Sequence, residues 1–593
     1  MADEQVQTET ICDVIKYAQD IQPFPLIKIY SGVGSGKSFF ATTMIKGSEE
    51  HEIPKHNVLI ITSRRIKVEE TMKEMGVLIT EKITKNGNLN FDVLTGDILP
   101  DESEQYAKAI KYTYDWGEST HITYNKSVVC TNAYISAYLK YLHDISDPVT
   151  HIWNKFDAII VDEVHSLITD ATYQPATYAV LSLIKEYLNL YQNNQLQSCA
   201  CQNLILMTGT PQPFDELVNL DFPEEKTRTI NLFDTCKNVV PNNVTIIDKL
   251  TSTNKVKELL LRGEKVVYFT NHTLTEEGAR KKFDLPDGVC IGVSFSSEDK
   301  RKQVSEEEQE RIRAIDKSLS QHSLIPNEIQ LFVTTSRNKE GINIHNPDIH
   351  NMFVETHLMY DAVQMAGRVR TGVENFYIIS NADQFEYCNN LTDILFSKKI
   401  MVENADYAHS DDEANKYLIS EYLQTPDTTP TEGDICKIKS YVEYIENRFA
   451  YIRYNVFRQR FEFFYQKEVA ERYAYNQIQT FAQKVSENST DFVQEWFPLS
   501  SIKWELSVAE RATIYMKNVI GPRNYITLSK CELKEHISVI REMFHSSLKS
   551  PNPILHLVDE KFNCEPNGEN YDLYYGTENP RKKKKSMRKR GKQ

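Results

Sequence analysis

The stretch PLIKIYSGVGSGKSFFATTMIK, residues 25–46, constrains the fold of this 593-residue chain more than any other segment. Its apolar start, 26–30, predicts a buried strand, a glycine-rich turn follows, and the residues after the turn contain no Gly or Pro and predict a helix. Gly34 and Gly36 allow the backbone to approach an anion that any Cβ would block, beside N–H groups at a helix start. The segment therefore predicts a phosphate-binding loop between a strand and a helix.

The same loop predicts a nucleotide site with a metal ion. The Lys37 ammonium is expected on the β and γ phosphates, and the Ser38 hydroxyl on Mg²⁺. The pattern GxxxxGK[ST] is met except at its first position, where Ser31 stands, and a residue that small still permits the turn. The expected nucleotide contacts in the loop are Gly34, Ser35, Gly36, Lys37 and Ser38.

An acidic pair stands in the segment FDAIIVDEVHS, residues 156–166. The apolar run 158–161 predicts a buried strand, and a carboxylate at its carboxyl end lies at the sheet edge where ligands collect. Asp162 is expected to hold Mg²⁺ through water, and Glu163 to orient and deprotonate an attacking water. Two acids after an apolar run are common, and it is their pairing with the phosphate loop that favours catalysis.

Other apolar runs also end in small polar residues, namely VLIITSRR (58–65), SVVCTNAY (127–134) and LILMTGTPQP (204–213). At least five candidate strands thus alternate with helical stretches, which predicts a parallel α/β domain over 1–235. A second α/β domain, 236–385, is predicted from KVVYFTN (265–271), IQLFVTTS (329–336) and FYIIS (376–380). This domain has no phosphate loop of its own.

Taken in order along residues 31–370, the motifs resemble those of superfamily-two helicases and translocases, in the DEAD/DEAH-like form with a DEVH box. They read SGVGSGKS, TSRR, CTNA, DEVH, TGTP, VVYFTN, VTTSRNKEGINI and QMAGRVR. The last is also similar to the version in herpesvirus-type origin-binding helicases and their phage and plasmid relatives. The resemblance implies two tandem RecA-like domains that share one ATP with Mg²⁺, close and open with hydrolysis, and grip nucleic acid.

The resemblance also implies roles for single residues. Arg368 is implied as an arginine finger on the γ-phosphate, with Arg370 as a second contact and Gln364 in the same catalytic set, while Gly341 borders the nucleotide. Near a helix start, two residues correspond to about 200° of rotation, so Arg368 and Arg370 reach one phosphate only if the turn is irregular. The implied coupling elements are His165, Thr208, Gly209 and Thr210. The implied contacts to a nucleic-acid backbone are Ser63, Arg64, Thr131, Thr335 and Ser336.

The chain departs from the family pattern at several positions. Asn343 stands where many members carry Asp, which bears on how the second domain senses nucleotide. Thr371 occupies the place of the usual second arginine, three residues after Arg368. Gln22 is the candidate for reading adenine upstream of the loop.

The resemblance stops near residue 385, and 386–580 is expected to form a mainly helical region that could bind a protein partner. The stretch 424–434, QTPDTTPTEGD, reads as a linker or exposed loop. From Ile438 to Val456, apolar residues recur at spacings of four and three, which predicts an amphipathic helix. Arginines and aromatic residues in that helix would either hold phosphates and bases or form an ordinary basic face.

The formal net charge is −15, yet nine Lys and Arg residues lie in the last thirteen positions, 581–593. This basic tail is expected to be disordered, and to bind phosphates, act as a nuclear address in a eukaryotic or viral host, or solubilise the chain. The ten cysteines form no CxxC pair, which argues against a zinc site or a disulfide framework. With an acidic N-terminus and no run of about 18 apolar residues, the chain is expected to be intracellular, cytoplasmic and without membrane contact.

Three functions compete on these residues. The first is an ATP-dependent helicase or translocase on DNA, single-stranded or a tailed duplex, in replication, repair or mobile-element biology. The second is an RNA helicase, which would keep the same motifs. The third is a nucleotide-gated module that binds or loads nucleic acid and never unwinds it. The oligomeric state is open in all three.

Overall fold

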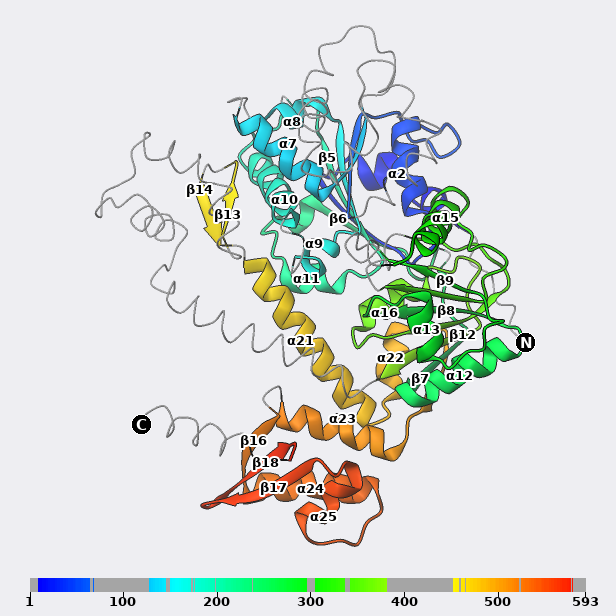
Figure 1. Cartoon of the computed structure of the whole chain (residues 1–593). Helices are drawn as coiled ribbons and strands as arrows, with labels where there is room; N and C mark the ends of the chain where they lie inside the picture. Colours follow the sequence, from blue (N-terminus) through cyan, green and yellow to red (C-terminus); the bar gives the residue numbers. More distant parts are fainter. Residues whose placement is uncertain are drawn as a thin grey trace, which may run out of the picture. The chain divides into compact units, whose positions relative to one another are not determined.

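The computed structural model describes residues 9–63, 68, 127–144, 150–171, 174, 176–197, 199–236, 238–295, 304–335, 342–380, 452–457, 460–463, 465–521, 524–577 and 579 (Figure 1). These residues divide into two compact units. Of the described residues, the first unit holds those up to Val239, 342–343 and those within 452–472. The second holds those within 240–335, 344–380 and those from Tyr473 onward.

The first unit is built on a parallel sheet whose six described strands have the order β3-β2-β4-β5-β1-β6 (Figure 1). Their bounds are β1 (Leu26–Tyr30), β2 (Val58–Thr62), β3 (Val128–Thr131), β4 (Ala158–Asp162), β5 (Asn203–Thr208) and β6 (Thr227–Asn231). Every residue of β2, β4 and β5 is buried, which is why these strands read as unbroken apolar runs rather than as alternating patterns. Because the strands are parallel, their carboxyl ends meet at one edge of the sheet.

Helices cover both faces of this sheet. They are α1 (Ile11–Val14), α2 (Lys37–Lys46), α7 (Asn132–Asp144), α8 (Thr150–Lys155), α9 (Ser166–Thr169), α10 (Thr177–Gln192) and α11 (Gln212–Leu217), with the π-helix η1 (Tyr17–Ile21) and the 3-10 helix η3 (Glu224–Lys226). Successive strand residues enter opposite cores, so that Ile159 and Val161 pack with α7 and α10 whereas Ile160 packs with α2. The predicted parallel α/β architecture is therefore correct for this unit.

The second unit contains a parallel sheet of seven described strands in the order β15-β7-β12-β11-β8-β10-β9. The strands are β7 (Asn243–Asp248), β8 (Lys265–Thr270), β9 (Ile291–Ser294), β10 (Leu331–Thr335), β11 (Ile349–Val354), β12 (Asn375–Ser380) and β15 (Ser501–Glu505). The helices that follow its first strands are α12 (Lys249–Leu261), α13 (Glu276–Lys282), α15 (Glu306–His322) and α16 (Met359–Ala366). The side chains of Asp248, Thr275 and Ser305 cap α12, α13 and α15, each accepting a backbone N–H three residues on, which explains where these helices begin.

The edge strand β15 comes from the region beyond residue 385, which was expected to be mainly helical. It pairs in parallel with β7, with Ser501 opposite Asn243 and Glu505 opposite Ile247. The strand is half exposed, and only Ile502 and Trp504 are apolar within it. A five-residue strand with so little apolar content gives no periodic signal, so the predicted end of the second α/β domain at residue 385 is corrected here, while the helices expected beyond it are present.

The rest of the C-terminal region combines helices with a small antiparallel sheet. Its helices are α21 (Tyr465–Ser486), α22 (Thr490–Trp496), α23 (Val508–Ile520), α24 (Lys530–Met543) and α25 (Pro551–Val558). The strands β16 (Tyr525–Ser529), β17 (Phe562–Asn567) and β18 (Asn570–Tyr575) form a sheet in the order β16-β18-β17. Residues of α23, α24 and α25 share one apolar core with this sheet, so this part is α+β rather than all helical.

A second correction concerns the helix expected from 438 to 456. The strand β13 (Ile452–Asn455) occupies its last turn and pairs antiparallel with β14 (Arg460–Phe463). Val456, just after β13, is buried in the core that contains α10. The spacing of apolar residues fits a helix there, but pairing across the following turn determines the conformation.

Several expectations fall on residues outside the described ranges. These are the linker 424–434, most of the expected helix 438–456, the tail 581–593, and the site residues Arg64, Ser336 and Gly341. Among the helices that the structure describes, none has both the length and the apolarity needed to cross a bilayer.

Candidate functional site

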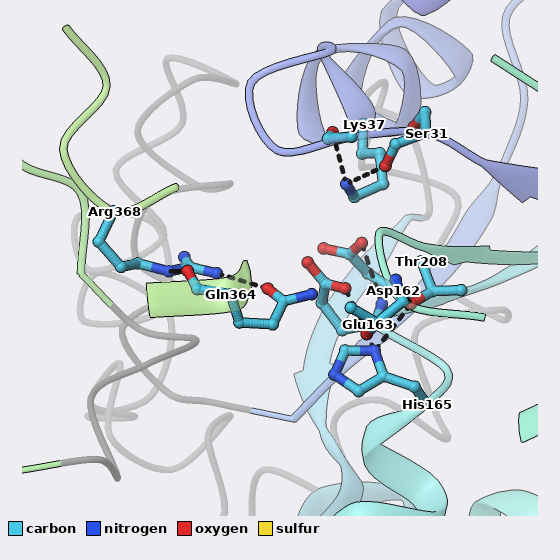
Figure 2. A network of polar contacts seen from close by, with 10 residues as sticks. Ser31, Lys37, Asp162, Glu163, His165, Thr208, Gln364 and Arg368 are labelled. Carbon is cyan, nitrogen blue, oxygen red and sulfur yellow. Dashed lines mark hydrogen bonds and ion pairs between the residues drawn. The ribbon is translucent and has the colours of Figure 1, made fainter. Parts of the chain in front are cut away.

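The glycine-rich loop joins β1 to α2 at the carboxyl edge of the first sheet. Gly34 has φ of +89° and Gly36 of +94°, a region that residues with a Cβ rarely adopt. The Lys37 ammonium donates hydrogen bonds to the carbonyl oxygens of Ser31 (3.1 Å) and Gly32 (3.2 Å), as Figure 2 shows in part. The loop thus has its glycines where the backbone needs them, with the lysine held over its carbonyls.

Ser31, the departure from the usual first glycine, is fully buried and takes part in the loop. The Ser35 hydroxyl lies 2.8 Å from the Ser31 hydroxyl and 2.8 Å from the Gly32 carbonyl oxygen. No positive φ occurs at Ser31, so its backbone needs no glycine. The expectation that a small residue suffices is met, and the hydroxyl adds a contact that the motif alone does not predict.

The acidic pair lies where β4 ends. Asp162 and Glu163 are both buried, at 5% and 8% exposure, and Asp162 Oδ1 accepts the Glu163 N–H at 3.1 Å. Glu163 has φ of +53°, a left-handed conformation that costs about 1–3 kcal/mol for a residue with a side chain. The strand therefore turns sharply at the second acid and places both carboxylates at the same edge as Lys37.

His165 links the acidic pair to the neighbouring strand. Its Nδ1 lies 2.7 Å from the Thr208 hydroxyl and 3.5 Å from Glu163 Oε2 (Figure 2). Thr208 ends β5, and its hydroxyl oxygen also accepts the N–H of Thr210 at 3.0 Å, across Gly209. The structure thus brings together, within one unit, the four residues expected to couple the sites and the acid expected to be the base.

Two of the residues expected to contact nucleic acid lie at adjacent strand ends. Thr131 ends β3 and is paired with Thr62, the last residue of β2, so Ser63 follows directly beside it. Ser63 and Thr131 are 6% and 5% exposed. On the second sheet Thr335 ends β10 and is buried, and its hydroxyl has no hydrogen-bond partner among the described residues.

The two arginines follow the end of α16 rather than a helix start. Arg368 is 4% exposed, and its guanidinium donates to the Gln364 backbone oxygen (3.1 Å) and to Gln364 Oε1 (3.0 Å), as drawn in Figure 2. Ile344 donates its N–H to the Arg368 carbonyl and accepts the Arg370 N–H, each at 2.8 Å, which forms a parallel bridge with Val369. Arg368 and Arg370 lie in turns on either side of the single bridge residue Val369, so the backbone is irregular here and is not a helix start.

Sequence reasoning missed a buried ion pair in the second unit. Glu355, after β11, accepts from Tyr268 Oη (2.7 Å), Thr270 Oγ1 (2.6 Å) and Lys282 Nζ (2.5 Å). Burial alone would raise the pKa of this carboxyl, but the Lys282 charge and the hydrogen bonds hold it below its ordinary value. A lone acid after an apolar run carries no signal in the sequence, because its partners come from other strands and helices.

Comparison with known proteins gives a family match over the first five strands of the first sheet. Residues 1–213 match the family described as "Type III restriction enzyme, res subunit". That match contains the phosphate loop, the acidic pair and the segment from Thr208 to Thr210, which are the parts whose geometry is described above.

The matched part is similar to that family, and it covers 213 of the 593 residues. No curated protein sequence matches this chain.

Solved helicase structures resemble it at low identity. Dbp5 of S. cerevisiae, bound to RNA and ADP BeF3, is 13% identical with a TM-score of 0.36, covering 60% of this chain and 79% of its own. The Mycobacterium smegmatis helicase Lhr, bound to ssDNA and AMP-PNP, is 13% identical with a TM-score of 0.38, covering 62% and 45%. The Escherichia coli DEAH/RHA helicase HrpB is 11% identical with a TM-score of 0.38, covering 86% and 63%. At TM-scores this low, functional assignments depend on the residues themselves.

The oxygen donors of the candidate site fit Mg²⁺. The ion prefers oxygen ligands and usually keeps several waters, binding proteins through one or two carboxylates and the substrate's phosphates. The Asp162 carboxylate and the Ser38 hydroxyl are of this kind, at the end of β4 and in the first turn of α2. Within the described ranges no group of three or more His, Cys, Asp or Glu side chains could hold a metal by itself, so phosphates would complete the shell.

Proposed function

We propose that the chain hydrolyses ATP with Mg²⁺ to move along nucleic acid, and that its substrate is DNA in single-stranded or tailed form. The observation that carries the proposal is the contact chain from Glu163 through His165 to Thr208, because it joins a candidate base to the end of the next strand. A phosphate-binding loop alone would fit many nucleotide-binding proteins. The link from Glu163 through His165 to the segment 208–210 fits a protein whose conformation changes with the nucleotide that it holds.

The binding step is proposed for the loop. When the phosphates of ATP enter, the Lys37 ammonium exchanges the carbonyl oxygens of Ser31 and Gly32 for phosphate oxygens, which are the stronger partners because they are charged. The N–H groups at the start of α2 face the same anion. Mg²⁺, when bound by Ser38 and Asp162, would neutralise charge on the phosphates.

The chemical step is proposed for Glu163 and Arg368. Glu163 would orient a water and accept its proton, a role in which a positioned carboxylate contributes about 10²–10⁴ in rate. Arg368, held by Gln364 in the second unit, would stabilise the charge that develops on the transferred phosphoryl group. Its existing bonds to Gln364 fix the direction of the guanidinium and reduce the entropy lost when it engages.

Nucleic-acid contacts are proposed at the strand ends. Ser63, Thr131 and Thr335 carry short hydroxyls, which suit phosphate oxygens and do not read bases. The buried Thr335 hydroxyl supports this role, because a buried hydroxyl without a partner costs free energy unless a ligand supplies one. The preference for DNA rests on the likeness of QMAGRVR to origin-binding helicases.

A panel of nucleic acids tests the proposal. Hydrolysis is measured with single-stranded DNA and with single-stranded RNA of the same sequence, and strand separation with tailed duplexes of each kind. We expect DNA to stimulate hydrolysis more than RNA and to be unwound. Stimulation by RNA alone would favour the RNA helicase, and tight ATP-dependent binding without unwinding or turnover would favour the loading module.

A further inference from the structure

The segment that connects the two sheets packs directly on the phosphate-binding loop. Val239 donates its backbone N–H to the Val33 carbonyl at 2.9 Å, and Leu232 donates to the Tyr30 carbonyl at 2.7 Å. A Cβ built on Gly32 would lie 2.2 Å from the Asn238 side chain, and one on Gly34 would lie 2.8 Å from Val239 Cγ2. The connecting segment therefore occupies the space beside the loop that side chains would otherwise fill.

The same segment is anchored at its other end within the second unit. Asn242 donates its N–H to the Val373 carbonyl at 3.2 Å, and Asn243 donates to the Glu374 carbonyl at 2.9 Å. Val373 and Glu374 follow Arg370 closely and lead into β12, which pairs with β7 along its whole length. Only two residues, Val240 and Pro241, separate the last contact with the loop from the first contact near the arginines.

We propose that Asn238 and Val239 are positioning residues whose packing changes when nucleotide binds the phosphate loop. Residues 238–243 would transmit that change to the segment 368–374, which carries the two arginines. This inference rests on the proposed nucleotide binding and adds a route by which the loop and the arginine-bearing unit are coupled. Neither residue would touch the nucleotide. Both would act through Gly32 and Val33.

Physical coupling follows from the bonds that the Gly32 carbonyl makes. It accepts from Lys37 Nζ and from the Ser35 hydroxyl, so redirecting the Lys37 ammonium to a phosphate removes a charged partner from the loop's first turn. Gly32 and Val33 then shift, and the Asn238 side chain and the Val239 N–H lose their fit. A connector of so few residues cannot absorb that displacement as a long flexible linker would.

Hydrogen exchange of the full chain, with and without Mg²⁺ and AMP-PNP, tests the route. Nucleotide occupancy is measured by calorimetry in the same samples. We expect bound nucleotide to speed exchange of the Val239 amide about tenfold, the effect of losing one backbone hydrogen bond. Exchange in peptides covering 241–246 and 372–376 should change with it.

Three glycine variants distinguish transmission through residues 238–243 from a general loosening of the structure. Gly32→Ala places a methyl group against Asn238 and should make Val239 exchange fast even without nucleotide, with no further response in 372–376. Gly32→Ala combined with Asn238→Ala removes the three atoms nearest to that methyl group and should restore the wild-type pattern. Gly288→Ala is the matched control, because nothing lies within 4 Å of its Cβ.

The outcomes are distinct. If wild-type protein binds AMP-PNP and exchange in 238–243 does not change, the inference is wrong and the proposed nucleotide site stands. If Gly32→Ala keeps the wild-type protection and response, the packing of Asn238 on the loop transmits nothing and the inference is again overturned. If wild-type protein binds no nucleotide, the proposed function fails and this inference fails with it.

Discussion

His165 and Thr208 are joined by a buried hydrogen bond of 2.7 Å between Nδ1 and the hydroxyl, while the same nitrogen lies 3.5 Å from Glu163. One imidazole therefore contacts both the candidate base and the end of the next strand. A displacement of Glu163 during hydrolysis would move His165, and Thr208 would follow because the packed interior leaves no free space.

His165→Ala should uncouple hydrolysis from nucleic acid. Basal ATP turnover is expected to stay within a few fold, because Glu163 keeps its place at the end of β4, while stimulation by nucleic acid falls by at least about tenfold, the scale of a coupling energy of 1–3 kcal/mol. The measurement is turnover with and without a saturating single strand. Thr208→Val should behave alike, and full stimulation in both variants would remove this contact from the coupling.

Lys37→Ala should lower ATP turnover by about 10² or more, the scale of losing one preorganised donor. The ammonium now bonded to the loop carbonyls is the charge that the phosphates would take up. Steady-state hydrolysis and nucleotide binding are measured beside Lys46→Ala, an exposed lysine at the end of the same helix. Equal rates in the two variants would show that the loop is not the nucleotide site.

Glu163→Gln should keep nucleotide binding and lose hydrolysis by about 10²–10⁴, because the amide retains the shape of the side chain but accepts no proton. Asp162, whose carboxylate would hold the metal ion, is unchanged in this variant. Binding of ATP is measured by calorimetry and turnover by phosphate release. A parallel loss of affinity and rate would instead indicate that Glu163 holds the metal ion or the loop.

Arg368→Ala should lower stimulated hydrolysis by about 10³ or more while ATP affinity changes by less than about tenfold, as expected of a group that acts in the transition state. Arg370→Ala is compared directly, because Arg368 and Arg370 lie on either side of the bridge residue Val369. A larger loss with Arg370→Ala, and near-normal turnover with Arg368→Ala, would exchange their roles.

Acidification should destabilise the second unit through His357. Burial lowers the pKa of this imidazole to about 3 from 6.5, and its ring lies 5.1 Å from that of Phe481. Below pH 6.5 the unfolded chain binds a proton that the folded chain does not, so stability falls as the pH drops towards 3, by about 2 kcal/mol at pH 5. Thermal unfolding of His357→Gln at pH 7.5 and pH 5.0 should show a smaller acid loss than wild type.

The control for this pH effect is His350→Gln, at an exposed position on β11. It should lose stability on acidification as wild type does. If wild type, His357→Gln and His350→Gln lose the same stability between pH 7.5 and pH 5.0, His357 does not cause the effect.

The parts of the fold that the sequence predicts well are those whose signal is local. β4 and the acidic pair could be placed because a strand buried on both faces reads as an apolar run, and the turn at Lys37 because glycines with positive φ are needed there. The relation of Arg368 to Arg370 could not be predicted from the sequence, since it depends on a bridge between Val369 and Ile344, which lies more than twenty residues earlier. Likewise β13 depends on pairing with β14, which outweighs a helical spacing of apolar residues.

The strand β15 has a practical consequence for anyone dividing this protein into fragments. A fragment ending at residue 385, where the recognisable motifs end, would strip β7 of its outer neighbour and leave a row of backbone N–H and C=O groups open to pairing with another molecule. Such a fragment would tend to self-associate, and its measured turnover would report aggregates. A fragment that keeps this edge of the sheet covered would have to run past Glu505, the last residue of β15.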